Sequence, residues 1–90
     1  MVYLHVRQTV AAFDKWPLGF DANEANRLAA GATGVHHIYR DVDSPNTVSI
    51  MMEWDSVDNA RRFMNDPRLE EVSRKAGVTG MPERTILERA

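Results

Sequence analysis

The stretch from Val35 to Trp54 constrains the fold more than any other part of the chain. Two runs rich in β-forming residues, Val35–Val42 and Thr47–Trp54, flank the turn-forming residues 43–46, which read DSPN. This pattern predicts a β-hairpin. The second run is apolar at both alternating sets of positions, and a small domain can rarely bury both faces of one strand. We therefore expect this strand to line a cavity and to contact a second copy of the chain.

The segment before the hairpin predicts one strand and one helix. Val2, Leu4 and Val6 alternate with polar or aromatic residues, as in a half-buried strand. A helix is expected from about Asp14 or Asp21 to Ala30, followed by a stop at Gly31. Its expected apolar stripe contains Phe13, Trp16, Phe20 and Leu28.

The segment after the hairpin predicts a helical pair and a last strand. Ser56 is the expected cap of a short helix, and Asp66-Pro67 is the expected start of a second helical segment that ends at Gly77. A loop is expected over Val78–Pro82, followed by a strand over Glu83–Glu88. The resulting order, β-α-β-β-α-β, predicts a single ferredoxin-like α+β domain over residues 1–90, with a four-stranded antiparallel sheet.

The composition excludes several classes of protein. The 90 residues include no cysteine, so disulfides, thiolate metal sites and thiol nucleophiles are absent. A net charge of −2, with acidic residues interleaved among the basic ones, argues against a nucleic-acid partner. No apolar run is long enough for a membrane span, and the first residues alternate, unlike a signal peptide. We expect a cytoplasmic protein that binds neither nucleic acid nor a membrane.

The helices of this fold cover only one face of the sheet. Of the hairpin residues, Val48, Ile50, Met52 and Trp54 share one face of the second strand, and Ser49, Met51 and Glu53 share the other. Because neither face is clearly polar, we expect a homodimer that pairs through the sheet face.

Two short motifs add a resemblance to a known family. The segment EWDS at residues 53–56 lies at the end of the third strand, and the segment ARRFMNDPRLEE at residues 60–71 follows it. With the order of elements, they resemble the dimeric α/β-barrel superfamily, and within it the small proteins similar to antibiotic biosynthesis monooxygenases. The resemblance implies a homodimeric α/β barrel. Known activities of the superfamily include cofactor-free oxygenation, isomerisation and haem degradation. Its haem degraders carry an axial histidine on the helix after the third strand, and residues 56–77 contain none.

The candidate site residues cluster on the strands. His36 and His37 are neighbours on one strand, so their side chains leave opposite faces and only one can face a given cavity. A shift of one residue in register exchanges them. The catalytic candidates are His37, His5, His36, Tyr39 and Arg7, and the candidates for contact with a substrate are Trp54, Met51, Met52, Tyr3 and Glu53.

These residues suggest acid–base chemistry beside a carbonyl of an aromatic or polyketide-like substrate. A histidine can act as the base near neutral pH, and Arg7 or Tyr39 could stabilise the enolate oxygen. The reaction class is monooxygenase-, isomerase- or cyclase-type and needs no organic cofactor. A metal site formed by His5, a hairpin histidine and Glu53 is disfavoured because their strands place the imidazoles about 10 Å apart. The alternative is a non-catalytic ligand-binding or accessory dimer of the same fold, so catalysis itself stays open.

Overall fold

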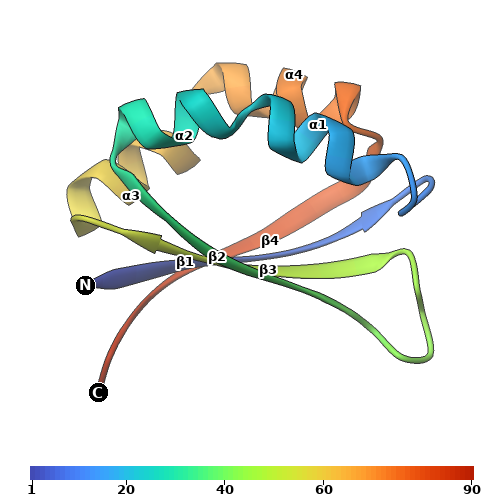
Figure 1. Ribbon diagram of the computed structural model, residues 1–90, viewed down its shortest axis with the longest axis horizontal. Helices are drawn as coiled ribbons and strands as arrows, with labels where there is room; N and C mark the ends of the chain where they lie inside the picture. Colours follow the sequence, from blue (N-terminus) through green and yellow to red (C-terminus); the bar gives the residue numbers. More distant parts are fainter.

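A computed structural model describes all residues, 1–90, as one sheet with helices on one side (Figure 1). In chain order the elements are β1 (Val2–Val10), α1 (Trp16–Ala22), α2 (Glu24–Ala30), β2 (Ala32–Arg40), β3 (Thr47–Trp54), α3 (Val57–Met64), α4 (Pro67–Lys75) and β4 (Val78–Glu88). The four strands are antiparallel in the order β2-β3-β1-β4. The predicted ferredoxin-like α+β fold is therefore confirmed.

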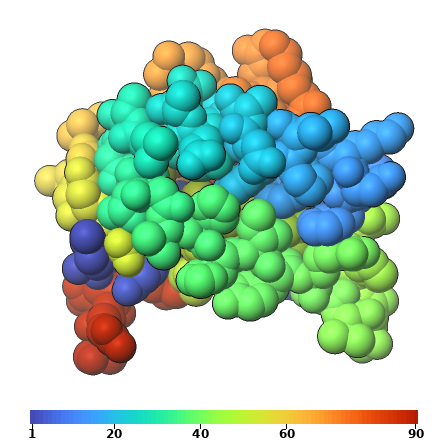
Figure 2. Space-filling model, in the orientation of Figure 1, coloured from blue at the N-terminus to red at the C-terminus, as the bar shows by residue number.

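The core lies between the sheet and the helices. Alternate residues of β1 and β3 point into it, because side chains of a strand leave opposite faces in turn. The largest fully buried side chains are Trp16, Trp54, Leu4, Val10 and Val48. The space-filling view shows α1 and α2 as blue and cyan atoms over the upper half of the molecule, with the green atoms of β2 below them (Figure 2). The other face of the sheet carries no helix (Figure 1).

The predicted helical pair after the hairpin is present. The Ser56 hydroxyl accepts a hydrogen bond of 3.1 Å from the backbone N–H of Asn59 and caps α3. The Asp66 carboxylate accepts one of 2.9 Å from the backbone N–H of Arg68 and caps α4, which begins at Pro67. These bonds satisfy N–H groups that a helix leaves without partners. No helix is long and apolar enough to cross a membrane.

The first helical region differs from the prediction. It consists of two helices that meet at Asn23, and neither Asp14 nor Asp21 caps them; the residues at the two starts, Lys15 and Asn23, make no side-chain cap. The predicted apolar stripe also ends early, because Leu28 is exposed and Arg27 is buried in its place. The break at Asn23 changes which residues of α2 face the sheet.

Two strand boundaries also differ. The second strand spans Ala32–Arg40 instead of Val35–Val42. The expected loop at Val78–Pro82 is part of β4, where Val78 pairs with Val10 and Thr79 with Thr9. Proline is tolerated there because β4 is an edge strand, so one side of its backbone has no partner strand.

Candidate functional site

The structure divides the predicted site residues between the two faces of the sheet. His36 lies on the helix side, where its ring meets that of Phe20 edge-on at a centroid distance of 5.1 Å. His37 lies on the opposite, uncovered face and stacks against Tyr39 at 6.4 Å. The two histidines therefore face apart, as the alternation of a strand requires. They cannot act on one substrate within a single chain.

The uncovered face also holds His5, Tyr3 and Arg7. The backbone of His5 is paired with that of Met51, which is paired in turn with that of His37, so Met51 stands between the two imidazoles. Their strands are separated by β3, a spacing of about 10 Å. Arg7 forms an ion pair with Asp41. The structure thus brings these residues to one face without joining them in one cluster.

Glu53 lies on the same uncovered face as Met51. Its carboxylate accepts a hydrogen bond of 3.0 Å from the Thr33 hydroxyl. Met52 and Trp54 lie on the helix side instead. Trp54 is fully buried, and its ring packs on that of Phe63 at 4.9 Å, while its indole N–H has no hydrogen-bond partner. Of the predicted contact residues, only Met52 lines the cavity described next.

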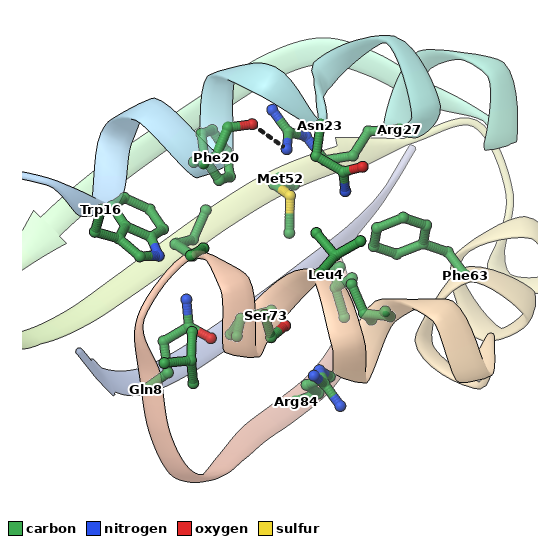
Figure 3. A pocket seen from close by; sticks show the side chains of 17 residues that line it. Leu4, Gln8, Trp16, Phe20, Asn23, Arg27, Met52, Phe63, Ser73 and Arg84 are labelled. Atoms are coloured by element: carbon green, nitrogen blue, oxygen red, sulfur yellow. Dashed lines mark hydrogen bonds between the residues drawn. The ribbon is translucent and has the colours of Figure 1, made fainter. Parts of the chain in front are cut away.

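A cavity of about 60 Å³ lies between the sheet and the helices (Figure 3). Most of its lining is apolar. The apolar residues come from β1, β3, β4 and all the helices except α2, and they are Leu4, Val6, Trp16, Phe20, Ile50, Met52, Phe63, Leu69, Val72, Ala76 and Val78. The remaining lining residues are Gln8, Gly19, Asn23, Arg27, Ser73 and Arg84. The cavity therefore contains a few polar groups in an apolar surround, which is the usual chemistry of a small-molecule site.

Arg27 is the most unusual of these polar groups. Its side chain is 5% exposed, and Nη1 donates a hydrogen bond of 2.7 Å to the backbone carbonyl of Phe20. The guanidinium carbon also lies 3.7 Å from the centre of the Phe20 ring. Nη2 is buried and has no partner. Burial lowers the pKa of Arg27, and the charges of Glu24 and Asp21 partly offset this effect.

A second arginine lines the same cavity. Burial lowers the pKa of Arg84, and the nearby charge of Glu70 opposes the change. Neither Arg27 nor Arg84 forms a salt bridge. No carboxylate or imidazole lines the cavity. A buried cation without a counter-ion is costly, so the site favours an anionic group or an oxygen that gains negative charge.

His36 is the histidine nearest to this site. It lines a small hollow together with Arg27 and Met52, both of which also line the cavity. Its Nδ1 lies 3.1 Å from the carbonyl oxygen of Gly34. In the tautomer that donates Nδ1–H to this carbonyl, Nε2 is a proton acceptor. The arrangement thus places a potential base beside a potential oxyanion-binding guanidinium.

Comparison with known proteins identifies the fold. A candidate antibiotic biosynthesis monooxygenase from Bordetella bronchiseptica superposes with a TM-score of 0.79 at 14% identity, covering 99% of this chain and 96% of that one. SnoaB from Streptomyces nogalater, a cofactor-independent oxygenase, was matched as a variant with a TM-score of 0.72 at 22% identity, covering 98% and 91%. A candidate antibiotic biosynthesis monooxygenase from Deinococcus radiodurans gives 0.67 at 18%, covering 100% and 93%.

The chain has the fold of the antibiotic biosynthesis monooxygenases. At these identities the likeness concerns the fold. Neither a family model nor a curated protein sequence matches the chain.

The polar residues of the cavity are not among the site residues that the sequence predicts. Gln8 continues the series Val2, Leu4, Val6 on the core side of β1, so its burial could have been read from the alternation. Arg27 gave no comparable signal, because an arginine on a short helix is usually exposed. Asn23 and Arg84 gave none either. Their positions depend on the break between α1 and α2 and on the extended β4.

Proposed function

We propose that this protein binds a small carbonyl compound in the cavity between helices and sheet and stabilises its enolate without an organic cofactor. The observation that carries the proposal is the buried, unpartnered Nη2 of Arg27. An unsatisfied buried donor costs about 1–3 kcal/mol, so a ligand that accepts a hydrogen bond from Nη2 would be stabilised there. A carbonyl oxygen that becomes an enolate is such a ligand, since it accepts more strongly as its charge grows.

In this proposal the proton acceptor is His36, which lines the small hollow beside the cavity together with Arg27 and Met52, and does not line the cavity itself. The bond between a substrate carbon and its α-hydrogen breaks, the proton moves to Nε2 of His36, and the electron pair spreads onto the carbonyl oxygen beside Arg27. Isomerisation, cyclisation and decarboxylation can all proceed through the enolate. With dioxygen as co-substrate, the carbanion can instead be oxygenated, and SnoaB is a cofactor-independent oxygenase. An aromatic or polyketide-like substrate would place only its enolisable end in this cavity of about 60 Å³.

The residues of the uncovered face belong to a second proposed location for the same chemistry. His37, His5, Tyr39 and Arg7 would form an enclosed site there only if another molecule covered the sheet. We propose a homodimer that does so. Tyr39 on this face is 60% exposed, and covering it with a second copy would remove apolar surface from water. Sedimentation of wild type and Tyr39→Asp tests this, with a shift toward the monomer expected for the variant.

A non-catalytic binding or accessory role is the competing function, and one observation favours it. The cavity measures about 60 Å³, whereas an engineered protein cavity that admits benzene measures about 150 Å³. The side chains of the chain itself therefore fill most of the space. A protein of this fold that had lost its chemistry would show such a filled interior.

Binding is tested with 1-phenylbutane-1,3-dione, whose enol and enolate differ in ultraviolet absorption. A neighbouring unpaired guanidinium should lower the apparent pKa of the bound diketone by about 1–2 units. The variant Arg27→Met should abolish this shift, while Arg27→Lys should retain part of it. Arg61→Met is the matched control, because Arg61 lies exposed on α3. An unchanged pKa shift in Arg27→Met would contradict the proposal.

Catalysis is tested by exchange of the α-protons of 1-phenylpropan-2-one with D₂O, followed by NMR. If His36 is the base, His36→Gln should slow exchange by about 100-fold or more. Slowing in His37→Gln or His5→Gln would place the site on the uncovered face. A wild-type protein that binds the diketone yet shows no exchange above solvent would support the non-catalytic role.

A further inference from the structure

A large open cleft adjoins the cavity. It measures about 690 Å³ and lies between α2 on one side and α3 and α4 on the other. The cleft and the cavity share four lining residues, which are Asn23, Phe63, Leu69 and Val72. The two spaces are therefore adjacent, and these four residues border both. The cleft has the volume of a typical small-molecule site, about 300–1,000 Å³, whereas the cavity can hold only one functional group.

The cleft presents apolar surface and neutral hydrogen-bonding groups together. Leu28, Ala29 and Phe63 supply apolar surface, and Leu28 is 45% exposed. The side-chain amide of Asn26 donates to the Asn23 side-chain oxygen at 2.7 Å, and Arg62 donates to that of Asn59 at 3.1 Å. These bonds hold the amides in fixed orientations, with further donors and acceptors left for a ligand.

The charges of the cleft are balanced, unlike those of the cavity. Asp66 is paired with Arg68 at 2.7 Å, and the Asp55 carboxylate accepts from the Asn59 amide at 3.0 Å. The cavity instead holds the unpartnered nitrogen of Arg27. One end of a ligand that spanned both spaces would therefore carry negative charge, and the rest would be uncharged.

Asn23 stands where the two spaces meet. It forms the break between α1 and α2, and its side chain points toward the cavity beside Phe63 (Figure 3). The side-chain oxygen of Asn23 accepts a hydrogen bond from Asn26, so the amide N–H groups of Asn23 remain as donors. A ligand passing from the cleft into the cavity would meet this amide first and Arg27 second.

We propose that the cleft holds the body of the ligand whose reacting end enters the cavity. The inference rests on the proposed function and names the ligand class: an elongated acyl compound with one enolisable carbonyl end and an uncharged, partly apolar body that bears hydrogen-bonding groups. The ligand divides into these two parts because the cavity, at about 60 Å³, is too small to hold a ring beside Arg27. Asn23 and Arg62 are then specificity-determining residues for the body of the ligand.

The test compares two diketones that share one end. Pentane-2,4-dione has only the acyl end, and 1-phenylbutane-1,3-dione adds a ring in place of one methyl group. Affinities are measured by quenching of tryptophan fluorescence, since Trp16 lines the cavity. Burial of the ring in the cleft should make the phenyl compound bind to wild type about tenfold tighter or more.

Two variants on α2 separate the cleft from the cavity. Ala29 lines the cleft and is exposed, so Ala29→Trp should fill it. This variant should lose the tenfold gain from the ring and bind pentane-2,4-dione as wild type does. Ala25 lies on the same helix, is also exposed and lines neither space, so Ala25→Trp is the matched control and should keep the gain.

The outcomes distinguish this inference from the proposed function. If pentane-2,4-dione binds in an Arg27-dependent manner and the ring adds nothing, the cleft is not part of the site and the inference alone fails. Equal loss of both diketones in Ala29→Trp would also overturn it. If neither diketone binds to wild type, the proposed function fails and the inference fails with it.

Discussion

The contact between α1 and α4 offers the sharpest test of how the cavity is closed. Gly19 of α1 and Ala76 after α4 both line the cavity. A Cβ atom built on Gly19 would lie 2.7 Å from the Cβ of Ala76 and 3.0 Å from its Cα. Ordinary contact begins at 3.4 Å, so Gly19→Ala requires the two segments to separate by at least 0.7 Å, the difference between 3.4 and 2.7 Å.

Two opposing effects set the size of the change in stability. Alanine in place of glycine within a helix stabilises by up to about 1 kcal/mol. Overpacking of a closed interior costs about 1–3 kcal/mol. Because backbone as well as side-chain atoms of Ala76 are too close, we expect overpacking to dominate and Gly19→Ala to lower the free energy of unfolding by about 1 kcal/mol.

Urea denaturation of the two single variants and the double variant measures this effect. In the background Ala76→Gly the Cβ contact is gone and only the 3.0 Å approach to Cα remains. Gly19→Ala should therefore be less harmful there, with a coupling energy of about 1 kcal/mol. A stabilising Gly19→Ala, with no coupling to Ala76→Gly, would show that α1 and α4 are not in contact and that the cavity is open at this end.

Three further predictions concern the capping, turn and core residues. Hydrogen bonds from Arg68 hold the pKa of Asp66 below 3.8, so Asp66 should stabilise wild type relative to Asp66→Asn above about pH 4. That advantage should disappear as the pH falls through the folded-state pKa; urea midpoints at pH 7 and pH 3 that show the same difference would contradict it. Gly31→Ala should lower the free energy of unfolding by about 3 kcal/mol, because Gly31 has φ +125° and its new Cβ would lie 2.7 Å from a carboxylate oxygen of Asp55. An unchanged free energy of unfolding in urea would refute this. Trp54→Leu should cost about 3 kcal/mol by thermal unfolding, since Trp54 is fully buried; a change below about 1 kcal/mol would argue against its burial.

The alternation of the strands was a reliable guide to the sheet. It placed Val48, Ile50, Met52 and Trp54 on one face, and all four are buried. It also separated His36 from His37 correctly, because the period of a strand depends on the backbone alone. The helix caps Ser56 and Asp66 were found for a similar reason: a capping bond joins residues two or three apart in the sequence.

The same local logic failed where a distant partner decides the conformation. Residues Val78–Pro82 contain a glycine and a proline and were expected to form a loop, yet pairing with β1 extends them as a strand. The first helical region was expected to be continuous, yet it breaks at Asn23. Propensity is a weak prior that packing overrides.

The sequence by itself therefore determined the order of the elements and which strand residues share a face, since both follow from short-range periodicity. Only the tertiary structure decided where a site could lie. The burial of Arg27 depends on how α2 sits over the sheet, and its missing partner becomes visible only when every neighbour is placed. From the sequence alone, a charged residue on a short helix is expected to be exposed to solvent. Its burial, and the cost of that burial, depend on residues that lie far along the chain.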